Sequence, residues 1–298
     1  MGIVGWLVGW FDANLVSIVD GVAYGLLLFT LAAGLSLVFG MMDVLNLAHG
    51  TLYLGGAYLT YLISGGGWFG FFAAIAAGVV LGAAGGVVLT AMTQPLAQRG
   101  HLDQALLTIG VALIGGEIFL ALSGGDPLPA SEPAALDWSL QVAGHTYPVY
   151  RLVFIGVAAL LALLVYLVFE RSTLGALVRA TVSDREMVQA LGVDTRKVLL
   201  GVFAFGGALA AVGGVLGAPI IGPAPGIDES VLVLSLVVVV VGGLGSIRGA
   251  LLGALYIGQV QTLGVAAFPK YAAFLLFGSM FLVLALRPRG LISIARAV

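Results

Sequence analysis

The polar side chains with the clearest capacity for chemistry form a short run between two apolar segments. Asp43, Asn46 and His49 recur every three residues within Met41–Gly50 (MMDVLNLAHG). Polar side chains are costly at membrane depth and usually face a cavity or pair with one another. Two interpretations follow. The run lines a path for solute, as part of a broken helix with freed backbone groups, or it forms an interfacial turn whose polar groups meet water.

A second isolated polar residue is Glu117, because the run from Ala105 to Leu122 is otherwise free of charge. A carboxylate in an apolar helix is a candidate for function, and its partner has to be identified. One interpretation is that Glu117 attracts the ammonium group of a substrate near the outer face. The other is that it is a hydrogen-bonded structural group.

Enzyme motifs are absent from the sequence. It contains no G-x-S-x-G elbow, no H-E-x-x-H pair and no paired aspartates suited to magnesium. The run Gly242–Gly249 lacks the Gly-Lys-Ser/Thr ending of a phosphate loop, and the absence of cysteine excludes disulfides and thiolate metal sites. We therefore expect no catalytic residue, no metal and no cofactor bound by this chain. If transport uses ATP, another chain hydrolyses it.

The glycines of this run are better suited to helix packing. Gly245, Gly249 and Gly253 recur every fourth residue, and Gly242 and Gly243 precede them. Small residues let helix backbones approach closely where lipid supplies no hydrophobic drive. We expect these five glycines to form a packing contact, with direct contact to substrate as the alternative.

The composition requires a membrane around the elements that carry these residues. Hydrophobic residues make up 61% of the chain and charged residues 9%, whereas soluble domains carry about 25% charged residues. Apolar runs near 20 residues indicate helices and exclude a strand barrel. We expect an all-α, polytopic bundle of eight or nine crossings, eight if 17–63 contains a broken or re-entrant piece. The nine candidates are residues 17–39, 44–63, 71–94, 103–122, 148–169, 198–217, 230–244, 249–268 and 271–286.

Charge predicts the orientation of the bundle. Placing the C-terminus in the cytoplasm puts all but Arg151 and Lys270 of the 12 basic residues inside, as the positive-inside rule requires. With nine crossings the N-terminus then lies outside. Residues 1–16 contain no Lys or Arg, so we expect no cleaved secretory signal. The net charge of −2 gives no reason to expect a nucleic-acid partner.

Three polar stretches are long enough to have a role of their own. Residues 123–148 are expected to form an extracytoplasmic loop, and 217–229 to cap the same face. Residues 170–197 form the long cytoplasmic connection, in which Ser183 and Glu186 predict a capping box and Gly192 a helix end. A short amphipathic helix there either lies on lipid or inserts into a cytoplasmic partner. Its mixed charge favours the partner.

Four groups of residues resemble the permease subunits of the branched-chain amino acid ABC importers, over about residues 20–291. They are Gly34–Gly40 with Val44–Gly50 and Gly56–Tyr58; Leu174–Ala180 with Asp184–Glu186 and Ala190–Val193; Gly242–Ile247 with Gly249–Ala250; and Arg287–Leu291. Two residues depart from the pattern of the family: Leu47 stands where Phe is common, and Arg248 where Pro is usual.

The resemblance implies a single transmembrane permease domain, 1–298, in the bacterial inner membrane. Its partners would be a homologous second permease subunit, two cytoplasmic ATPase subunits and an extracytoplasmic solute-binding protein. A coupling helix within 170–197 would enter a groove on the ATPase, through Arg179, Asp184, Arg185, Glu186, Ala190 and Gly192. Asp43, Asn46, His49 and Glu117 remain the candidates for the substrate path. The alternative function is a channel or an ion-coupled carrier for a small solute such as urea or an amide.

Overall fold

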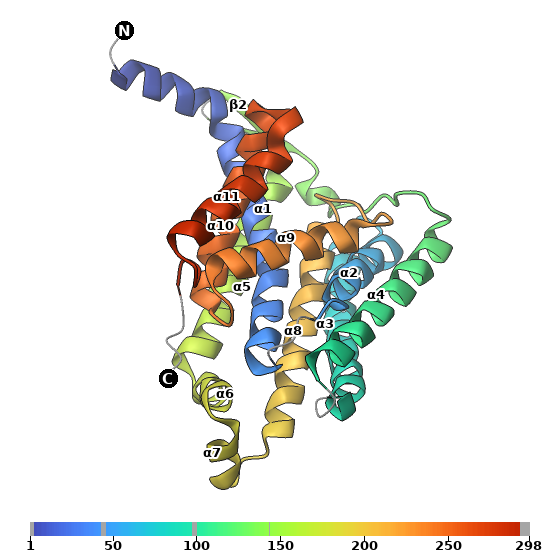
Figure 1. The fold of residues 1–298 in the computed structure, drawn as a ribbon. Helices are drawn as coiled ribbons and strands as arrows, with labels where there is room; N and C mark the ends of the chain where they lie inside the picture. Colours follow the sequence, from blue (N-terminus) through green and yellow to red (C-terminus); the bar gives the residue numbers. More distant parts are fainter. Residues whose placement is uncertain (1–2, 43–45, 97–99, 143, 293–298) are drawn as a thin grey trace.

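The computed structural model describes residues 3–42, 46–96, 100–142 and 144–292 (Figure 1). Their elements, in order, are α1 (Ile3–Met42), α2 (His49–Ile63), α3 (Trp68–Thr93), the 3₁₀ turn Gln94–Leu96, α4 (His101–Ser123), the 3₁₀ turn Ala134–Leu136, β1 (Ser139–Val142), β2 (His145–Pro148), α5 (Val149–Tyr166), the π-helical turn Leu167–Arg171, α6 (Thr173–Ser183), α7 (Arg185–Ala190), α8 (Thr195–Gly217), α9 (Ile227–Gly242), α10 (Ile247–Ala267), the 3₁₀ turn Pro269–Tyr271 and α11 (Ala272–Leu286). The all-α prediction is confirmed, and the chain is a multi-pass membrane protein.

Each of the nine expected crossings corresponds to a helix, but two of these helices are short. Among the described residues, seven are long and apolar enough to cross a membrane: α1, α3, α4, α5, α8, α10, and α11 when it is counted with the 3₁₀ turn before it, as Pro269–Leu286. The other two, α2 and α9, have 15 and 16 residues. At 1.5 Å per residue they measure about 22 and 24 Å, less than the hydrocarbon thickness of about 30 Å. The structure therefore departs from nine full-length crossings at these two helices.

The core forms around α1 and α8, which are the most buried of the seven long helices. Close approach of backbones depends on glycine. A Cβ added at Gly25 of α1 would lie 2.7 Å from the carbonyl oxygen of Ala254 on α10. On the other side of the core, Gly82 of α3 meets the backbone of Gly207 on α8. Small residues thus allow the tight packing that helices need in lipid.

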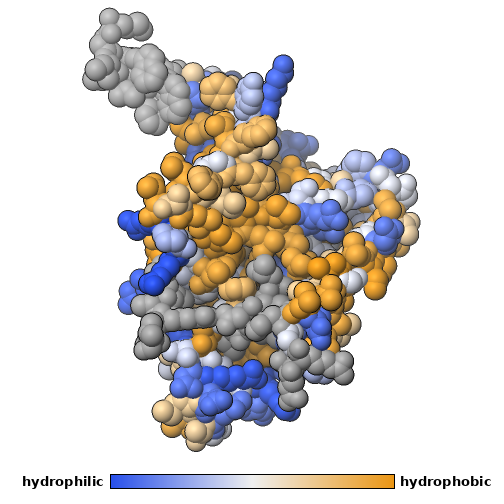
Figure 2. Space-filling model, viewed as in Figure 1, coloured by the Kyte–Doolittle hydropathy of each residue, from blue (hydrophilic) through white to orange (hydrophobic). Residues whose placement is uncertain are grey.

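The surface reflects this arrangement. Figure 2 shows a hydrophobic band across the middle of the molecule, with hydrophilic residues gathered at the end that carries α6 and α7 and at the opposite end. We call these the α7 end and the hairpin end, because β1 and β2 lie at the second. A surface of this kind matches a bilayer, whose apolar interior meets the band.

The segment 123–148, which we expect to be a loop, contains a β-hairpin made of β1 and β2, and this is the main difference from the prediction. Its two strands pair antiparallel, with Ser139 opposite Pro148 and Val142 opposite His145. At its base Asp20 of α1 accepts hydrogen bonds from the Tyr147 hydroxyl and the Arg151 guanidinium, both at 2.6 Å. Burial is the main cause that raises the pKa of Tyr147, and the bond to Asp20 raises it further. The phenol therefore stays a donor, and the hairpin is fixed to α1.

Candidate functional site

The first candidate site lies where α2 begins. The helix starts at His49, five residues later than expected, after a turn in which the His49 amide donates to the Asn46 carbonyl at 3.3 Å. The structure brings Asn46 and His49 together here. Asp43 lies outside the described residues.

His49 occupies a slot between α1 and α8. A Cβ added at Gly34 would lie 2.7 Å from His49 Nε2 and 2.7 Å from the Gly206 carbonyl oxygen, so the slot exists because residue 34 is glycine. Gly34 lies about 12 Å along α1 from Met42. The start of α2 therefore lies inside the bundle and not at its surface. The broken-helix interpretation requires this inner position.

Asn46 and His49 are both buried and incompletely bonded. Their exposed fractions are 3% and 1%, and Asn46 Oδ1 and both His49 ring nitrogens have no hydrogen-bond partner among the described residues. Buried polar atoms are nearly always paired, so unpaired ones need an explanation. A transported solute or ordered water that reaches this point would supply the missing bonds. The role of these residues in the substrate path stays a prediction.

Other buried polar atoms share this property, and sequence reasoning missed the residues that carry them. They are Ser36 on α1, Thr51 and Tyr53 on α2, Gln104 on α4 and Ser235 on α9. A serine, threonine or tyrosine inside an apolar run is common in membrane helices, so the sequence carried no signal that singled them out.

Glu117 does not join this group. It lies on α4, its side chain is exposed, and it makes no ion pair or hydrogen bond with any described residue. The structure thus separates the four substrate-path candidates into a buried pair, an exposed carboxylate and a residue outside the described ranges.

The second candidate site is the connection that contains α6 and α7. Ser172 caps α6 by accepting from the Gly175 amide at 3.2 Å, and Asp184 caps α7 by accepting from the Met187 amide at 2.8 Å. The expected cap Ser183 is instead the last residue of α6. Both residue types make good caps, and α6 continues to Ser183, so the cap moves one residue on.

The tip of this connection is rigid but points away from the bundle. After α7, Gly192 adopts a φ of +84°, which glycine tolerates and other residues rarely do. Gln189 Nε2 and Arg185 Nε both donate to Thr195 Oγ1, at 2.7 and 3.4 Å, and so tie α7 to the start of α8. Figure 1 shows α7 at the far end of the molecule.

The exposed face of α7 carries most of the expected coupling residues. Asp184, Arg185, Glu186, Ala190 and Gly192 are all exposed, while Val188 is buried. Two large apolar side chains stand among them: Met187 is 59% exposed and Leu191 is 75% exposed. Sequence reasoning missed Met187. An apolar pair within a charged surface is typical of a protein-binding site.

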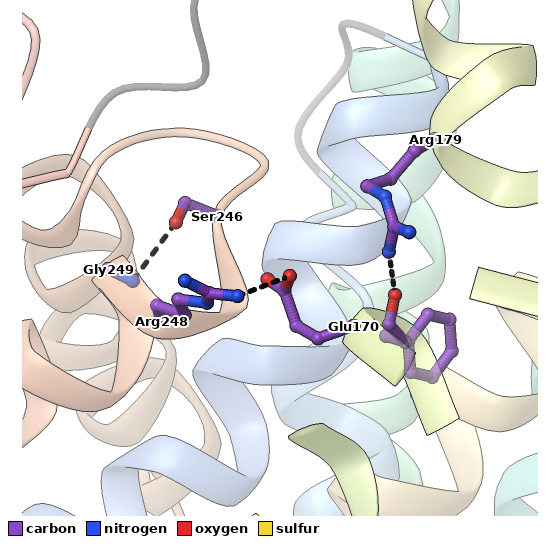
Figure 3. Close-up of polar contacts among 6 residues, drawn as sticks. Glu170, Arg179, Ser246, Arg248 and Gly249 are labelled. Carbon is purple, nitrogen blue, oxygen red and sulfur yellow. Dashed lines mark hydrogen bonds and ion pairs between the residues drawn. The ribbon is translucent and has the colours of Figure 1, made fainter. Parts of the chain in front are cut away.

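One polar contact joins α6 to the π-helical turn at the end of α5, and two more join the end of α5 to α10; Figure 3 shows the contacts of Arg179 and Glu170. The guanidinium of Arg179 on α6 donates to the Phe169 carbonyl in the π-helical turn. In the same turn, the Glu170 carboxylate lies 3.1 Å from the guanidinium of Arg248, near the start of α10. Arg248 also lies over the ring of Tyr166, 5.4 Å from its centroid. The end of α5 therefore connects α6 with α10.

The glycine-rich run forms the turn from α9 to α10. Gly242 and Gly249 pack backbone against backbone, and a Cβ at Gly253 would lie 2.6 Å from the Val238 carbonyl oxygen. Gly243 and Gly245 have φ values of +110° and +79°, so they shape the turn itself. Ser246 then caps α10 by accepting from the Gly249 amide at 3.0 Å.

The C-terminal segment binds to this turn. The amides of Leu291 and Ile292 donate to the carbonyls of Val241 and Gly242, at 2.8 and 3.0 Å. Two of the four sequence signatures thus contact each other here, and a Cβ at Gly40 of a third would lie 3.4 Å from Gly245 in the same turn. Among the described residues no group of three or more His, Cys, Asp and Glu side chains is placed to hold a metal ion.

Comparison with known proteins agrees with this architecture. Residues 17–284 match the family described as the branched-chain amino acid transport system permease component. The chain is 28% identical to the high-affinity branched-chain amino acid transport system permease protein BraD of Pseudomonas aeruginosa, over 93% of this chain and 95% of BraD. It is 28% identical to the corresponding protein LivH of Escherichia coli, over 92% and 93%. The match to the fructose import permease protein FrcC of Rhizobium meliloti is 27%, over 63% and 54%.

The family match includes part or all of each of the seven long helices, and the whole connection that contains α7. The family is described as a permease component and these relatives are named as permease proteins, so the chain is a transport subunit. The chain therefore belongs to the permease component family of branched-chain amino acid transport systems.

Proposed function

We propose that this chain is a permease subunit of an ATP-driven importer in the bacterial inner membrane. It moves branched-chain amino acids or related small polar solutes that an extracytoplasmic solute-binding protein delivers. A homologous second permease subunit and two cytoplasmic ATPase subunits complete the assembly. Residues 1–298 form one permease domain that binds no cofactor, and ATP is used by the partner subunits.

The observation that carries this proposal is the exposed face of α7. The helix is capped at Asp184, fixed to α8 through Thr195, and presents Met187 and Leu191 to solvent. A channel or a carrier working alone has no use for a rigid apolar tip outside the membrane. In an importer, this tip fits a groove on the ATPase, and closure of the ATPase dimer moves it as a rigid body.

The contacts behind α7 give that movement a route into the bundle. Arg179 holds α6 to the π-helical turn, and Glu170 holds this turn to Arg248 on α10. A displacement of α6 and α7 therefore reaches α5 and α10.

Charge supports the orientation. The α7 end carries Arg179, Arg185 and Arg196, whereas Arg151 lies at the start of α5 beside the hairpin. By the positive-inside rule the α7 end and the C-terminus are cytoplasmic. The hairpin end, with the 123–148 loop, then faces the solute-binding protein.

The test is capture of the co-expressed ATPase by the purified permease. Changing Met187 and Leu191 together to alanine should reduce recovered ATPase at least about tenfold, because apolar anchors dominate such interfaces. Leu286→Ala is the matched control, since Leu286 is also 75% exposed and lies on α11. Equal recovery from all three proteins would remove the coupling assignment.

A second measurement tests the importer itself. Vesicles that contain the permease pair, the ATPase and the solute-binding protein should accumulate solute only when ATP is present. Uphill uptake by vesicles that contain this chain alone would overturn the proposal.

A further inference from the structure

Helix α4 is the least buried of the seven long helices. It lies along the right edge of the molecule in Figure 1 and packs against α2 and α3. One side of it is well fixed. Phe119 packs on the ring of Tyr58 at 5.4 Å between centroids, and the Tyr58 hydroxyl donates to the Leu122 carbonyl at 3.4 Å. The other side carries exposed residues and has no packing partner among the residues that the structure describes.

That open side has a defined composition. Leu106, Gly110, Leu113 and Glu117 follow one another at spacings of three and four residues, which places them on one face of a helix. Leu106 and Leu113 are 57% and 59% exposed, and a Cβ at Gly110 would meet nothing within 4 Å. We call these four residues the Glu117 face.

A lipid-facing helix explains the leucines but not the carboxylate. Glu117 lies six residues before Ser123, about 9 Å from the end of α4, within the apolar part of the helix. Ionisable side chains in membrane helices almost always face a bundle interior or a water-filled cavity and pair with another group. Glu117 makes no interaction with any described residue.

Another carboxylate of this chain shows the usual arrangement. Asp20 also lies within a long apolar helix, and it binds Arg151 and Tyr147 at 2.6 Å each. The carboxylate of Asp20 is thus paired with two side chains of the same chain. Glu117 has no such partner among the described residues, so a neighbouring subunit is a candidate source of one.

We propose that the Glu117 face packs against the second, homologous permease subunit, which places a cationic or hydrogen-bond-donating side chain opposite Glu117. This inference rests on the proposed function, and it adds the position of the interface and the chemistry of the partner. An identical copy fits this face less well, because a two-fold interface repeats the same patch on both subunits. The face would then bring Glu117 against Glu117 with no base between them.

The open position at Gly110 supports helix contact at this face. Small residues at such an interface let two helix backbones approach closely. Gly110 lies two turns before Glu117 on the same side, so a partner helix that passes close at Gly110 reaches Glu117 as well. Helix α11 has a similar open glycine, Gly278, between exposed Phe274 and Phe281, but it carries no acidic residue, so the carboxylate is what distinguishes the Glu117 face.

The experiment uses a photo-activated benzoylphenylalanine at position 113 in membranes that contain the complete importer. Position 281 on α11 is the control, since Phe281 is 72% exposed but has no acidic neighbour on its face. The expected result is a covalent product of position 113 with the second permease subunit, identified by mass spectrometry, and none at position 281. A product with a second copy of this chain, with lipid alone, or equally at both positions would overturn the proposal.

A second set of variants tests the chemistry. Glu117→Leu should lower the amount of second permease that co-purifies at least about fivefold, and Glu117→Gln should restore part of it, because an amide still accepts hydrogen bonds. Intact pairing with a raised KM for uptake would assign Glu117 to substrate and overturn the interface. Loss of ATP-dependent uptake and of capture through α7 would count against the importer proposal. Loss of the cross-link at position 113 while both of these are retained would count against the interface alone.

Discussion

The Arg248 guanidinium lies 3.1 Å from the Glu170 carboxylate and also covers the ring of Tyr166, so one side chain at the start of α10 holds two groups at the end of α5. Glu170 belongs to a π-helical turn, a feature that is rare and frequent at functional sites. The next helix along the chain is α6, which leads to the exposed α7. The pair therefore lies between the membrane bundle and the proposed contact with the ATPase.

Breaking this ion pair should affect transport more than stability. The side chains of Arg248 and Glu170 are 53% and 21% exposed, so the pair contributes no more than about 1 kcal/mol to folding. Glu170→Gln should leave the yield of purified protein unchanged. ATP-driven uptake should fall by a factor of about three to ten, within the range of single coupling contacts.

Charge reversal provides the control for this prediction. The double variant Glu170→Arg with Arg248→Glu should regain uptake that each single variant loses. Uptake in the single variants equal to that of the wild type would show that the contact does not transmit motion.

Glycine at the α9–α10 turn should be essential for folding. Leucine at Gly249 would place a side chain against the backbone of Gly242, which cannot move aside as a flexible side chain can. Overpacking of this kind costs about 1–3 kcal/mol or more. We expect Gly249→Leu to abolish folded protein in fluorescence size-exclusion profiles.

Gly278 is the matched control for Gly249, since it also lies within a helix but a Cβ there meets nothing within 4 Å. Gly278→Leu should give a normal profile. If the two variants give the same profile, the need for glycine at position 249 does not come from close approach of the helix backbones.

The base of the hairpin should show strong coupling between Asp20 and Arg151. Their side chains are 25% and 35% exposed, and loss of one partner leaves the other charge unpaired. Asp20→Asn and Arg151→Met should each lower thermal stability by about 1–2 kcal/mol, less than for a fully buried pair. The double variant should cost less than the sum, and a purely additive double-mutant cycle would contradict the interaction.

The raised pKa of Tyr147 predicts how the hydrogen bond between Tyr147 and Asp20 depends on pH. Its pKa is raised, mainly by burial, so the folded state favours the neutral phenol. The stabilisation is then fully present below the ordinary tyrosine pKa of about 10 and is lost only as pH rises through the higher folded value. Thermal unfolding of the wild type relative to Tyr147→Phe should keep a constant difference from pH 6 to about pH 9. A difference that disappears in that range would contradict the hydrogen bond to Asp20.

The buried pair at the start of α2 should affect uptake if it lines the substrate path. We expect Asn46→Ala and His49→Ala to assemble with their partners and to lower uptake about tenfold or alter its specificity, as loss of a buried polar contact to solute does. Co-purification of the ATPase reports assembly, and competition between amino acids reports specificity. Normal uptake with unchanged competition would make both residues structural.

The sequence by itself determined that this chain is a bundle of membrane helices. Hydrophobicity over 20 residues is a local property, and the missing hydrogen-bond partners in hydrocarbon leave the helix as the structure for such runs. The same local logic located the amphipathic segment that became α7. It also marked Gly192 as a helix end, since a left-handed residue there favours glycine.

Tertiary structure alone decided how the polar residues are used. Asp20 and Glu117 are both carboxylates in apolar runs, yet one has partners 127 and 131 residues away and the other has none among the described residues. The start of α2 at His49 depends on a slot between Gly34 and Gly206, and the Arg248 contact depends on where α5 ends. These outcomes are contacts between distant segments, and only the packing of the helices brings such segments together.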